Sequence, residues 1–212
     1  MKTNSISRWE QIEKNPPKSY SQFFKKEYKF LEKNISSNFL VLDIGCGTGR
    51  IMEILSKISK KVIGIDNDIS AVKKCETRSK KLNNVKIFLE SVQKIHFKDD
   101  SFDAIVCLNL FENLSKLRNK ALLEIRRVLK KEGILILSVY NEVALEERLK
   151  VYRKIETENF KVLDNGKVKF NDGLTSEQFS KEQIKEILDK TGFKIYDITK
   201  GKIYYLIKAK KK

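Results

Sequence analysis

Apolar residues follow two spacings that alternate along the chain, and this alternation predicts an α/β fold. Short apolar runs typical of buried parallel strands are followed by segments whose apolar residues recur every three or four positions, as on one face of a helix. We predict strands at residues 39–44, 62–65, 85–89, 102–109 and 134–140, the last of these opened by Gly133. Helices are predicted at residues 49–59, about 68–82 and about 115–130. Strands that alternate with helices imply a parallel sheet with right-handed crossovers.

The segment after the fifth strand departs from this repeat. A charged helix is predicted at about 142–157, followed by an alternating segment around Asn165-Gly166, a dipeptide typical of tight hairpin turns. The last predicted elements are a helix at about 180–190 that ends at Gly192 and strands at about 193–199 and 202–208.

A glycine-rich turn between the first strand and its helix carries the clearest functional signal. Residues 41–50 read VLDIGCGTGR, a buried strand that breaks into a turn and then enters a helix. Glycines let the backbone approach a ligand without a Cβ in the way, and the helix N-terminus offers free N–H groups. Asp66 ends the next strand, where a carboxylate can bind both hydroxyls of a ribose. Together these features predict a site for a nucleoside-bearing cofactor.

The spacing of the glycines indicates which cofactor. Dinucleotide sites use G-x-G-x-x-G, whereas Gly45, Gly47 and Gly49 give G-x-G-x-G and are followed by Arg50. A carboxylate at Asp43 would repel a pyrophosphate but could attract an ammonium or a sulfonium. The pattern therefore favours a cationic nucleoside that bears an amino acid.

Four motifs in order resemble those of class I S-adenosylmethionine-dependent methyltransferases. They lie at residues 39–50, 64–66, 101–106 and 123–137, and the last two read SFDAIV and LEIRRVLKKEGILIL. The resemblance implies a Rossmann-like doubly wound seven-stranded sheet, mostly parallel with an antiparallel last strand, and helices on both faces. It also implies S-adenosyl-L-methionine as the cofactor and methyl transfer to a nucleophilic N or O.

We expect a single domain over residues 1–212. Residues 8–35 are predicted to be mostly helical, with a break at Pro16-Pro17. The expected divisions are an N-terminal helical lid segment (1–38), the cofactor-binding core (39–140), a helix-plus-hairpin insertion (141–178), the last helix with the edge strands (179–208) and a basic tail (208–212). The insertion is either the element that selects the substrate or a hairpin that merely covers the sheet.

The resemblance assigns roles around the glycine turn. Gly45, Gly47 and Gly49 would line the methionine side of the cofactor, with Cys46 part of the same turn. Asp43 would lie close to the amino-acid end.

The resemblance also assigns the nucleoside end of the cofactor. Asp66 would bind the ribose, and Asn67 would flank the adenine. Ser91-Val92 falls where many relatives carry Asp-Ala, so the Ser91 contact to adenine is in question, although the Val92 backbone can still serve and Glu90 is a substitute.

Candidate catalytic residues follow the fourth and fifth strands. Asn109 is expected to face the methyl group or the amino-acid end of the cofactor. Glu112 could bind a cationic acceptor or take its proton, or it could be an acid favoured by a helix N-terminus. Tyr140, with Asn141, is expected to face the same cleft, whereas Tyr20 is either part of a lid or a core residue.

Proximity and desolvation carry much of the acceleration, so a general base is optional when the acceptor is an amine that binds unprotonated and matters more for a hydroxyl. His96, the only histidine, is expected to be a loop residue. The three cysteines lack metal-ligand spacing, and no metal is expected. We see no segment long and apolar enough to cross a bilayer and no secretory signal, so a cytoplasmic protein with no membrane partner is expected.

The net charge of +16 leaves the acceptor open. Most of the positive charge is scattered lysine, which an AT-rich genome would produce, and arginine, the residue preferred for bidentate phosphate recognition, is scarce. Only residues 208–212 form a basic block, and such tails are often solvated. The leading hypothesis is a small-molecule or metabolite-like acceptor. The alternatives are an RNA (tRNA or rRNA) methyltransferase that uses the basic surface and a non-catalytic protein that binds the cofactor or a partner.

Overall fold

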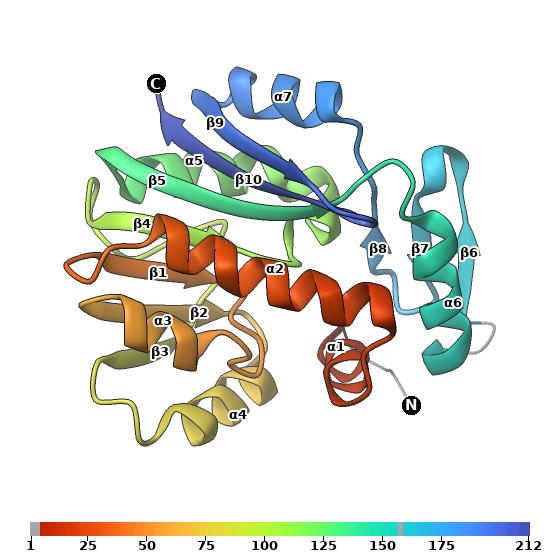
Figure 1. The fold of residues 1–212 in the computed structure, drawn as a ribbon, viewed down its shortest axis with the longest axis horizontal. Coiled ribbons are helices and arrows are strands. Elements are labelled where there is room, and N and C mark those ends of the chain that lie inside the picture. The colour runs from red at the N-terminus through yellow and green to blue at the C-terminus, as the bar shows by residue number, and fades with distance from the viewer. Residues whose placement is uncertain (1–4, 157–158) are drawn as a thin grey trace.

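The central feature is a mixed β-sheet (Figure 1). Residues 5–156 and 159–212, the part of the chain that the computed structural model describes, form a seven-stranded sheet of order β3-β2-β1-β4-β5-β10-β9 and a separate three-stranded sheet. The strands of the large sheet are β1 (Leu40–Ile44), β2 (Lys61–Asp66), β3 (Val85–Leu89), β4 (Phe102–Cys107), β5 (Leu129–Tyr140), β9 (Phe193–Lys200) and β10 (Tyr204–Lys211). The first five pair in parallel, and β10 pairs antiparallel with both β5 and β9. The predicted sheet is confirmed.

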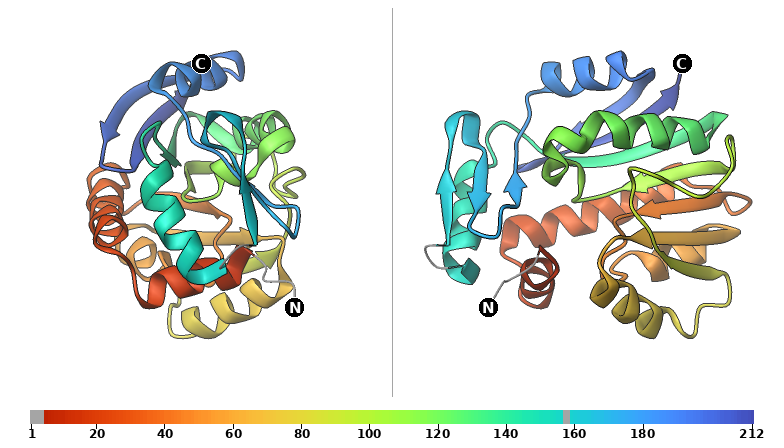
Figure 2. Two further views of the ribbon diagram at one scale, coloured as in Figure 1. Left: turned by 90° about the vertical axis from the view of Figure 1, so that its right-hand side faces the viewer. Right: turned by 180° about the vertical axis from the view of Figure 1, so that it is seen from behind.

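Helices cover both faces of this sheet, as predicted (Figure 2). They are α1 (Ser5–Lys14), α2 (Lys18–Asn34), α3 (Met52–Ile58), α4 (Ile69–Ser79), α5 (Arg118–Val128), α6 (Leu145–Glu156) and α7 (Lys181–Lys190). Leu31 of α2 and Leu55 of α3 belong to one buried core, whereas Ile125 of α5 and Leu188 of α7 belong to the other. Adjacent residues of β1 point into opposite cores, because side chains alternate across a strand.

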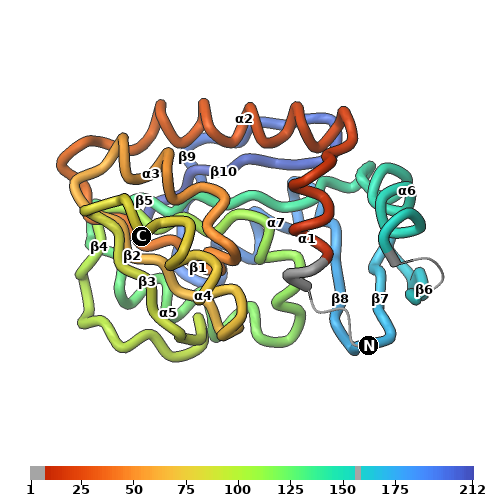
Figure 3. The backbone as a smooth tube through the Cα atoms, turned by 90° about the horizontal axis from the view of Figure 1, so that it is seen from below, coloured from red at the N-terminus to blue at the C-terminus, as the bar shows by residue number. Residues whose placement is uncertain are grey.

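The predicted break at Pro16-Pro17 separates α1 from α2. Figure 3 shows α2 running along the length of the sheet, and α1 turning back at its start. Proline fixes its own φ and disfavours helix in the residue before it, which explains why one helix ends and another begins here. Residues 1–4 of the expected lid segment lie outside the described residues.

Strand β5 begins earlier than predicted. Leu129 already pairs with Phe102 of β4, and Gly133 lies inside the strand instead of opening it. The register of the ladder shifts between Phe102 and Ala104 of β4. Leu129 pairs with Phe102 and Ile134 with Ala104, so the polar residues 130–133 form an irregular segment within β5. In the sequence, charged residues followed by a glycine look like a turn. A β-sheet can contain such a segment as a bulge, but no sequence pattern indicates this, so the strand was predicted to begin too late.

The basic block at 208–212 is not a solvated tail, and this prediction was wrong. Residues up to Lys211 belong to β10 and pair with β9, and Ala209 is fully buried. Lys211 Nζ donates to Asp100 Oδ1 at 2.6 Å and to the Leu129 carbonyl at 3.0 Å. Alternating lysines on a half-exposed strand look like a tail in the sequence, because the partner strands that hold them are distant in the chain.

The insertion forms a small layer beyond the carboxyl ends of the parallel strands (Figure 1). After α6, strands β6 (Phe160–Val162), β7 (Val168–Phe170) and β8 (Thr175–Ser176) form the three-stranded sheet. The predicted hairpin turn is confirmed, with positive φ at Asn165 (59°) and Gly166 (71°). The two-residue strand β8 was not predicted, since so short a strand leaves no periodic pattern. Residue 157 of the predicted helix lies outside the described residues.

Candidate active site

A cavity of about 310 Å³ opens where β1, β2 and β4 end. This is the edge at which open α/β sheets bind ligands, and the volume is within the usual range for small-molecule sites. Its walls combine the glycine turn, the loops after β2, β3 and β4, and α1. The main polar and glycine residues of the lining are Glu13, Asp43, Gly45, Gly47, Arg50, Asp66, Asn67, Glu90, Ser91, Asn109 and Asn113.

The glycine turn shapes the floor of this cavity. Gly45, Gly47 and Gly49 have φ values of 72°, 54° and 86°, a region that other residues rarely adopt. Gly45 and Gly47 line the cavity, as does Cys46. Gly49 does not; a Cβ there would lie 2.9 Å from Cys75 Sγ, so this glycine lets the turn pack against α4. Gly49 was predicted to line the cofactor site, but in the structure it packs against α4 and does not line the cavity.

Asp43 and Arg50 present charged atoms without partners at this floor. Asp43 is 2% exposed, and burial raises the pKa of its carboxyl to about 7 even though Arg50 opposes the shift. Among the described residues, neither Asp43 Oδ2 nor Arg50 Nη1 has a hydrogen-bond partner. A buried acceptor and a buried donor left unpaired are costly unless a ligand completes them. Asp43 could bind an ammonium group and Arg50 a carboxylate, and a free amino acid carries both groups.

A buried carboxylate on α2 holds two of the residues that line the floor of the cavity, Arg50 and Asn109. Glu27 is fully buried, and its Oε2 lies 2.8 Å from Arg50 Nη2. Its Oε1 accepts a hydrogen bond from Asn109 Nδ2 at 2.9 Å. Sequence reasoning missed both Glu27 and Arg50. A signal for Glu27 was available, because it lies on the apolar face of α2, one turn after Phe23.

Asn109 lies at the end of β4 in the predicted place. Its backbone has a φ of 58°, and its N–H donates to Ser138 Oγ at 2.9 Å. Asparagine tolerates this left-handed conformation better than most residues. Hydrogen bonds from its backbone to Ser138 and from its side chain to Glu27 therefore hold Asn109 in place at the wall of the cavity.

Asp66 lines the cavity at the end of β2. Its Oδ2 accepts from the Gly47 N–H and its Oδ1 from the Asp68 N–H, both at 2.9 Å. These bonds hold the carboxylate in one orientation, and each oxygen can still accept another bond. Burial raises its pKa from the ordinary value, although these backbone bonds oppose the shift. The arrangement suits a vicinal diol.

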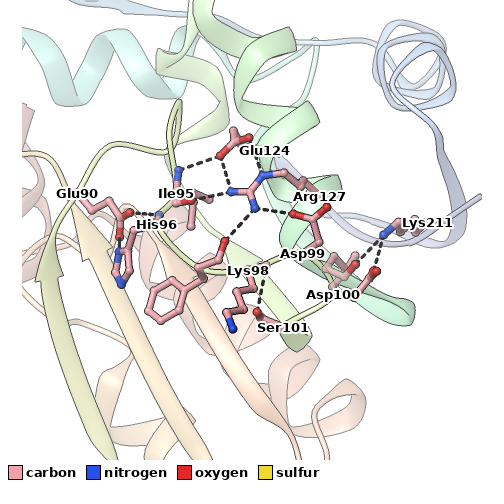
Figure 4. A network of polar contacts seen from close by, with 12 residues as sticks. Glu90, Ile95, His96, Lys98, Asp99, Asp100, Ser101, Glu124, Arg127 and Lys211 are labelled. Atoms are coloured by element: carbon pink, nitrogen blue, oxygen red, sulfur yellow. Dashed lines mark hydrogen bonds and ion pairs between the residues drawn. The ribbon is translucent and has the colours of Figure 1, made fainter.

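The loop after β3 carries Ser91 and Val92, which line the same cavity with Asn67. Figure 4 shows how this loop is held: His96 contacts the Glu90 carboxylate, with His96 Nδ1 at 2.7 Å from Oε2. Further along the loop, Arg127 donates to the Ile95 carbonyl at 2.6 Å (Figure 4). His96 is an exposed loop residue, as predicted. Glu90 therefore both stabilises the loop, through its contact with His96, and lines the cavity.

Glu112 and Tyr140 do not line this cavity, contrary to the expectation that they border the same cleft. They line a second cavity of about 30 Å³, which shares Trp9, Asn113 and Leu174 with the first. The two cavities therefore meet at these three residues. Glu112 lies in the 3₁₀ helix η1 (Phe111–Asn113), whose Asn113 lines both cavities while Glu112 lines only the second.

Tyr140 and Tyr20 are bonded to one another through their hydroxyls at 3.0 Å. Tyr20 is fully buried, so it is a core residue and not part of a lid. Burial raises the pKa of both hydroxyls well above the usual value. Asn141 was wrongly expected to face the cleft; it is buried, and its Nδ2 donates to the Gly201 carbonyl at 2.9 Å, which ties β5 to the turn before β10.

Helix α1 covers the main cavity with Trp9 and Glu13. Ion pairs fasten it to α4: Glu10 lies 2.7 Å from Lys74, and Glu13 lies 3.7 Å from Arg78. Arg8 forms a further ion pair with Asp172 of the insertion at 2.7 Å. The helix thus spans from α4 to the insertion.

Within residues 5–156 and 159–212, no group of three or more His, Cys, Asp or Glu side chains is arranged to hold a metal ion. None of the helices described is long and apolar enough to cross a membrane.

Comparison with known proteins identifies related sequences and folds. Residues 42–137 match the family described as "Methyltransferase domain". An uncharacterized protein of Methanocaldococcus jannaschii is 31% identical over 144 residues, which cover 63% of this chain and 60% of that relative. The chain thus spans less than two thirds of the length of this relative.

Two solved structures share the fold. A protein from Pyrococcus horikoshii OT3 superposes with a TM-score of 0.73 at 22% identity, covering 93% of each chain. The 1,6-didemethyltoxoflavin-N1-methyltransferase of Burkholderia thailandensis, solved with its substrate and S-adenosylhomocysteine, has a TM-score of 0.69 at 14% identity and covers 98% of this chain and 88% of that one.

Proposed function

Since the chain belongs to the class I S-adenosylmethionine-dependent methyltransferase family, we propose that it methylates a nucleophilic N or O of a small molecule. The observation that carries the proposal is the pair of unpartnered buried atoms, Asp43 Oδ2 and Arg50 Nη1, on the floor of the main cavity. When bound, S-adenosylmethionine supplies an electrophilic methyl carbon, whose bond to sulfur breaks with the electron pair passing to the neutral thioether.

Each wall of the main cavity has a role in this proposal. Asp43 binds the ammonium and Arg50 the carboxylate of the amino-acid end. Asp66 accepts hydrogen bonds from the ribose hydroxyls, while Asn67, Ser91 and Val92 border the adenine. The turn formed by Gly45, Cys46 and Gly47 allows close approach, and Gly49 supports that turn from behind.

Positioning and exclusion of water supply most of the acceleration in this proposal. Asn109, held by Glu27 and Ser138, orients the reacting end of the site. Glu112, the carboxyl group of the adjoining cavity, receives the proton that the acceptor loses when Glu112 is in its ionised form, above its raised pKa of about 8. Tyr140 acts as a wall of that cavity, because its raised pKa and its bond to Tyr20 disfavour proton transfer.

A small acceptor is favoured over a polynucleotide by the covering of the site. Trp9 of α1, Leu117 after β4 and Leu174 of the insertion all line the main cavity, so three separate segments border the region beyond the cofactor residues. We propose that α1 acts as a lid. The Burkholderia structure above shows that a protein of this fold can hold a small acceptor, 1,6-didemethyltoxoflavin.

The test is transfer of radiolabelled methyl from S-adenosylmethionine into host extract that is then separated into RNA, protein and small-molecule fractions. We expect label in the small-molecule fraction. Label in RNA that ribonuclease releases would overturn the proposal and make the positive charge functional. Binding of S-adenosylhomocysteine without transfer to any fraction would favour the non-catalytic alternative.

A further inference from the structure

The second cavity contains an unused hydrogen-bond acceptor. Glu112 is 1% exposed, and its Oε2 has no partner among the described residues. The other buried polar groups of the wall are paired: Tyr140 with Tyr20 at 3.0 Å, and Tyr152 with Ser176 at 3.1 Å. A buried acceptor left alone is costly, so this atom indicates a ligand that donates a hydrogen bond to it.

Two guanidinium groups beside the cavity disfavour a cationic ligand. Arg8 lines the cavity and stacks on Phe170 with its Cζ 4.0 Å from the ring centroid. Arg148 is fully buried and stacks on Tyr140 at 4.7 Å, and it forms no ion pair within the described part of the chain. Because the charge of Arg148 is balanced by no ion pair, a further cation beside it would be repelled.

The same guanidinium groups are poorly placed to receive an anion. Arg148 donates to the Ser176 carbonyl at 2.7 Å, to Ser176 Oγ at 2.9 Å and to the Gly166 carbonyl at 3.1 Å. Arg8 forms an ion pair with Asp172 at 2.7 Å. The terminal nitrogens of Arg148 are directed at the protein, and only its Nε has no partner among the described residues. An anion there would also meet the carboxyl of Glu112.

The size of the cavity limits what enters it. A cavity needs about 10–15 Å³ to hold one water molecule, so about 30 Å³ admits a single small polar group. The body of the ligand must then lie at the junction with the main cavity, between Trp9 and Leu174. An indole ring and a leucine side chain suit a flat apolar body.

We propose that the second cavity recognises the methyl acceptor through Glu112 Oε2, and that the acceptor is a small, uncharged, flat molecule that donates an N–H or O–H to it. This inference rests on the proposed function, since it assigns the acceptor side of the same site.

The experiment compares four ring compounds on the protein saturated with S-adenosylhomocysteine, by ligand-observed nuclear magnetic resonance. Phenol offers a neutral donor, anisole has no donor, and benzylammonium and benzoate carry opposite charges. We expect phenol to bind at least about tenfold more tightly than the other three, because a site built around a hydrogen bond rejects analogues that cannot make it.

Two variants locate the selectivity. Glu112→Leu removes the acceptor at similar size and should make phenol and anisole bind equally, whereas Glu112→Gln keeps an acceptor oxygen and should retain part of the preference. The control is Glu186→Leu, an exposed carboxylate that pairs with Lys190 on α7. Unchanged affinity for S-adenosylhomocysteine in every variant shows that the fold and the cofactor side are intact.

Tightest binding of a charged compound, equal binding of phenol and anisole to the unaltered protein, or no binding of any of the four would overturn the inference. A phenol preference that survives Glu112→Leu would do the same. None of these results bears on methyl transfer itself, which the labelled-methyl experiment tests separately. Label in RNA would contradict the proposed function without altering the measured preference for phenol.

Discussion

The two cavities differ in how the chain builds them. The main cavity is built chiefly from loops that follow consecutive parallel strands, and its glycine turn is one continuous segment. The second is assembled from α1, η1, the end of β5 and the insertion, which are far apart in the sequence. A site made by a local motif can be recognised before the fold is known, whereas a site made by distant segments exists only once the sheet has brought them together.

The largest effect is expected from breaking the buried ion pair below the main cavity. Arg50→Met removes the partner of a fully buried Glu27, which should lower the free energy of unfolding by about 3–5 kcal/mol. It should also weaken binding of S-adenosylhomocysteine by roughly 10–100-fold, since a charged hydrogen bond to the ligand is lost. Chemical denaturation and calorimetry measure the two effects.

Two further variants separate stability from binding. Adding Glu27→Gln to Arg50→Met removes the unpaired charge and should restore most of the stability without restoring affinity. Arg78→Met, at an exposed arginine 3.7 Å from Glu13, should change stability by less than about 1 kcal/mol. Recovery of affinity in the double variant would show that Arg50 acts only through the fold.

The second cavity should make stability depend on pH. Burial raises the pKa of Glu112 to about 8 from an ordinary 4.5, against the opposing charge of Arg148 on α6 and of Arg118 on α5, with Glu27 on α2 adding to the rise. Between these two values the unfolded chain binds fewer protons than the folded one. The free energy of unfolding should therefore fall as pH rises, by up to about 1.4 kcal/mol per pH unit, and level off above about pH 8.

Glu112→Gln should flatten this slope, which denaturation at several pH values between about 5 and 9 would measure. Asp43, whose pKa burial raises to about 7, gives a similar fall at lower pH, and that part should remain in the variant. A slope identical in the variant and the unaltered protein would mean that Glu112 is ionised in the folded state at neutral pH.

A smaller effect is expected at the ribose side of the main cavity. Asp66→Ala should weaken binding of S-adenosylhomocysteine by about 1–3 kcal/mol, because two hydroxyl groups lose their acceptor. Asp103→Ala is the control, since Asp103 pairs with Lys130 and the Leu40 N–H away from the cavity. Equal affinities in the two variants would refute the ribose assignment.

The smallest effect tests the end of β10. Lys211→Ala removes the bonds to Asp100 and to the Leu129 carbonyl and should cost about 0.5–1.5 kcal/mol of stability, measured by denaturation. Lys212→Ala, which breaks an exposed pair with Asp189, should cost less. A variant at Lys211 as stable as the unaltered protein would indicate that the paired end of the strand adds little.

The sequence predicted the sheet and most of the residues that line the main cavity, because both depend on local patterns. Alternating strand and helix spacings specify the parallel repeat, and the glycine turn with Asp66 needs only two neighbouring strands. Arg50 was visible in the sequence but was used only to exclude a dinucleotide. Glu27 was missed because a helix supplies it from outside the motif, and only its place on an apolar face marked it.

The second cavity could be predicted only in part. Glu112 and Tyr140 were selected from their positions after β4 and β5, but their assignment to a separate cavity depends on the turn of η1 and on α6. Arg148 was not selected at all, since an arginine in a charged helix resembles a solvated one. Its burial results from β8 and the hairpin turn, which accept its hydrogen bonds.

Trp9 links the two cavities, and this has a consequence for the order of events during turnover. Because α1 lines both, a movement of this helix that opens one cavity also uncovers the other. The ion pairs from α1 to α4 and to the insertion must then be broken for either ligand to leave. We therefore expect each ligand to lengthen the residence time of the other, so that the loss of either product speeds the release of the second.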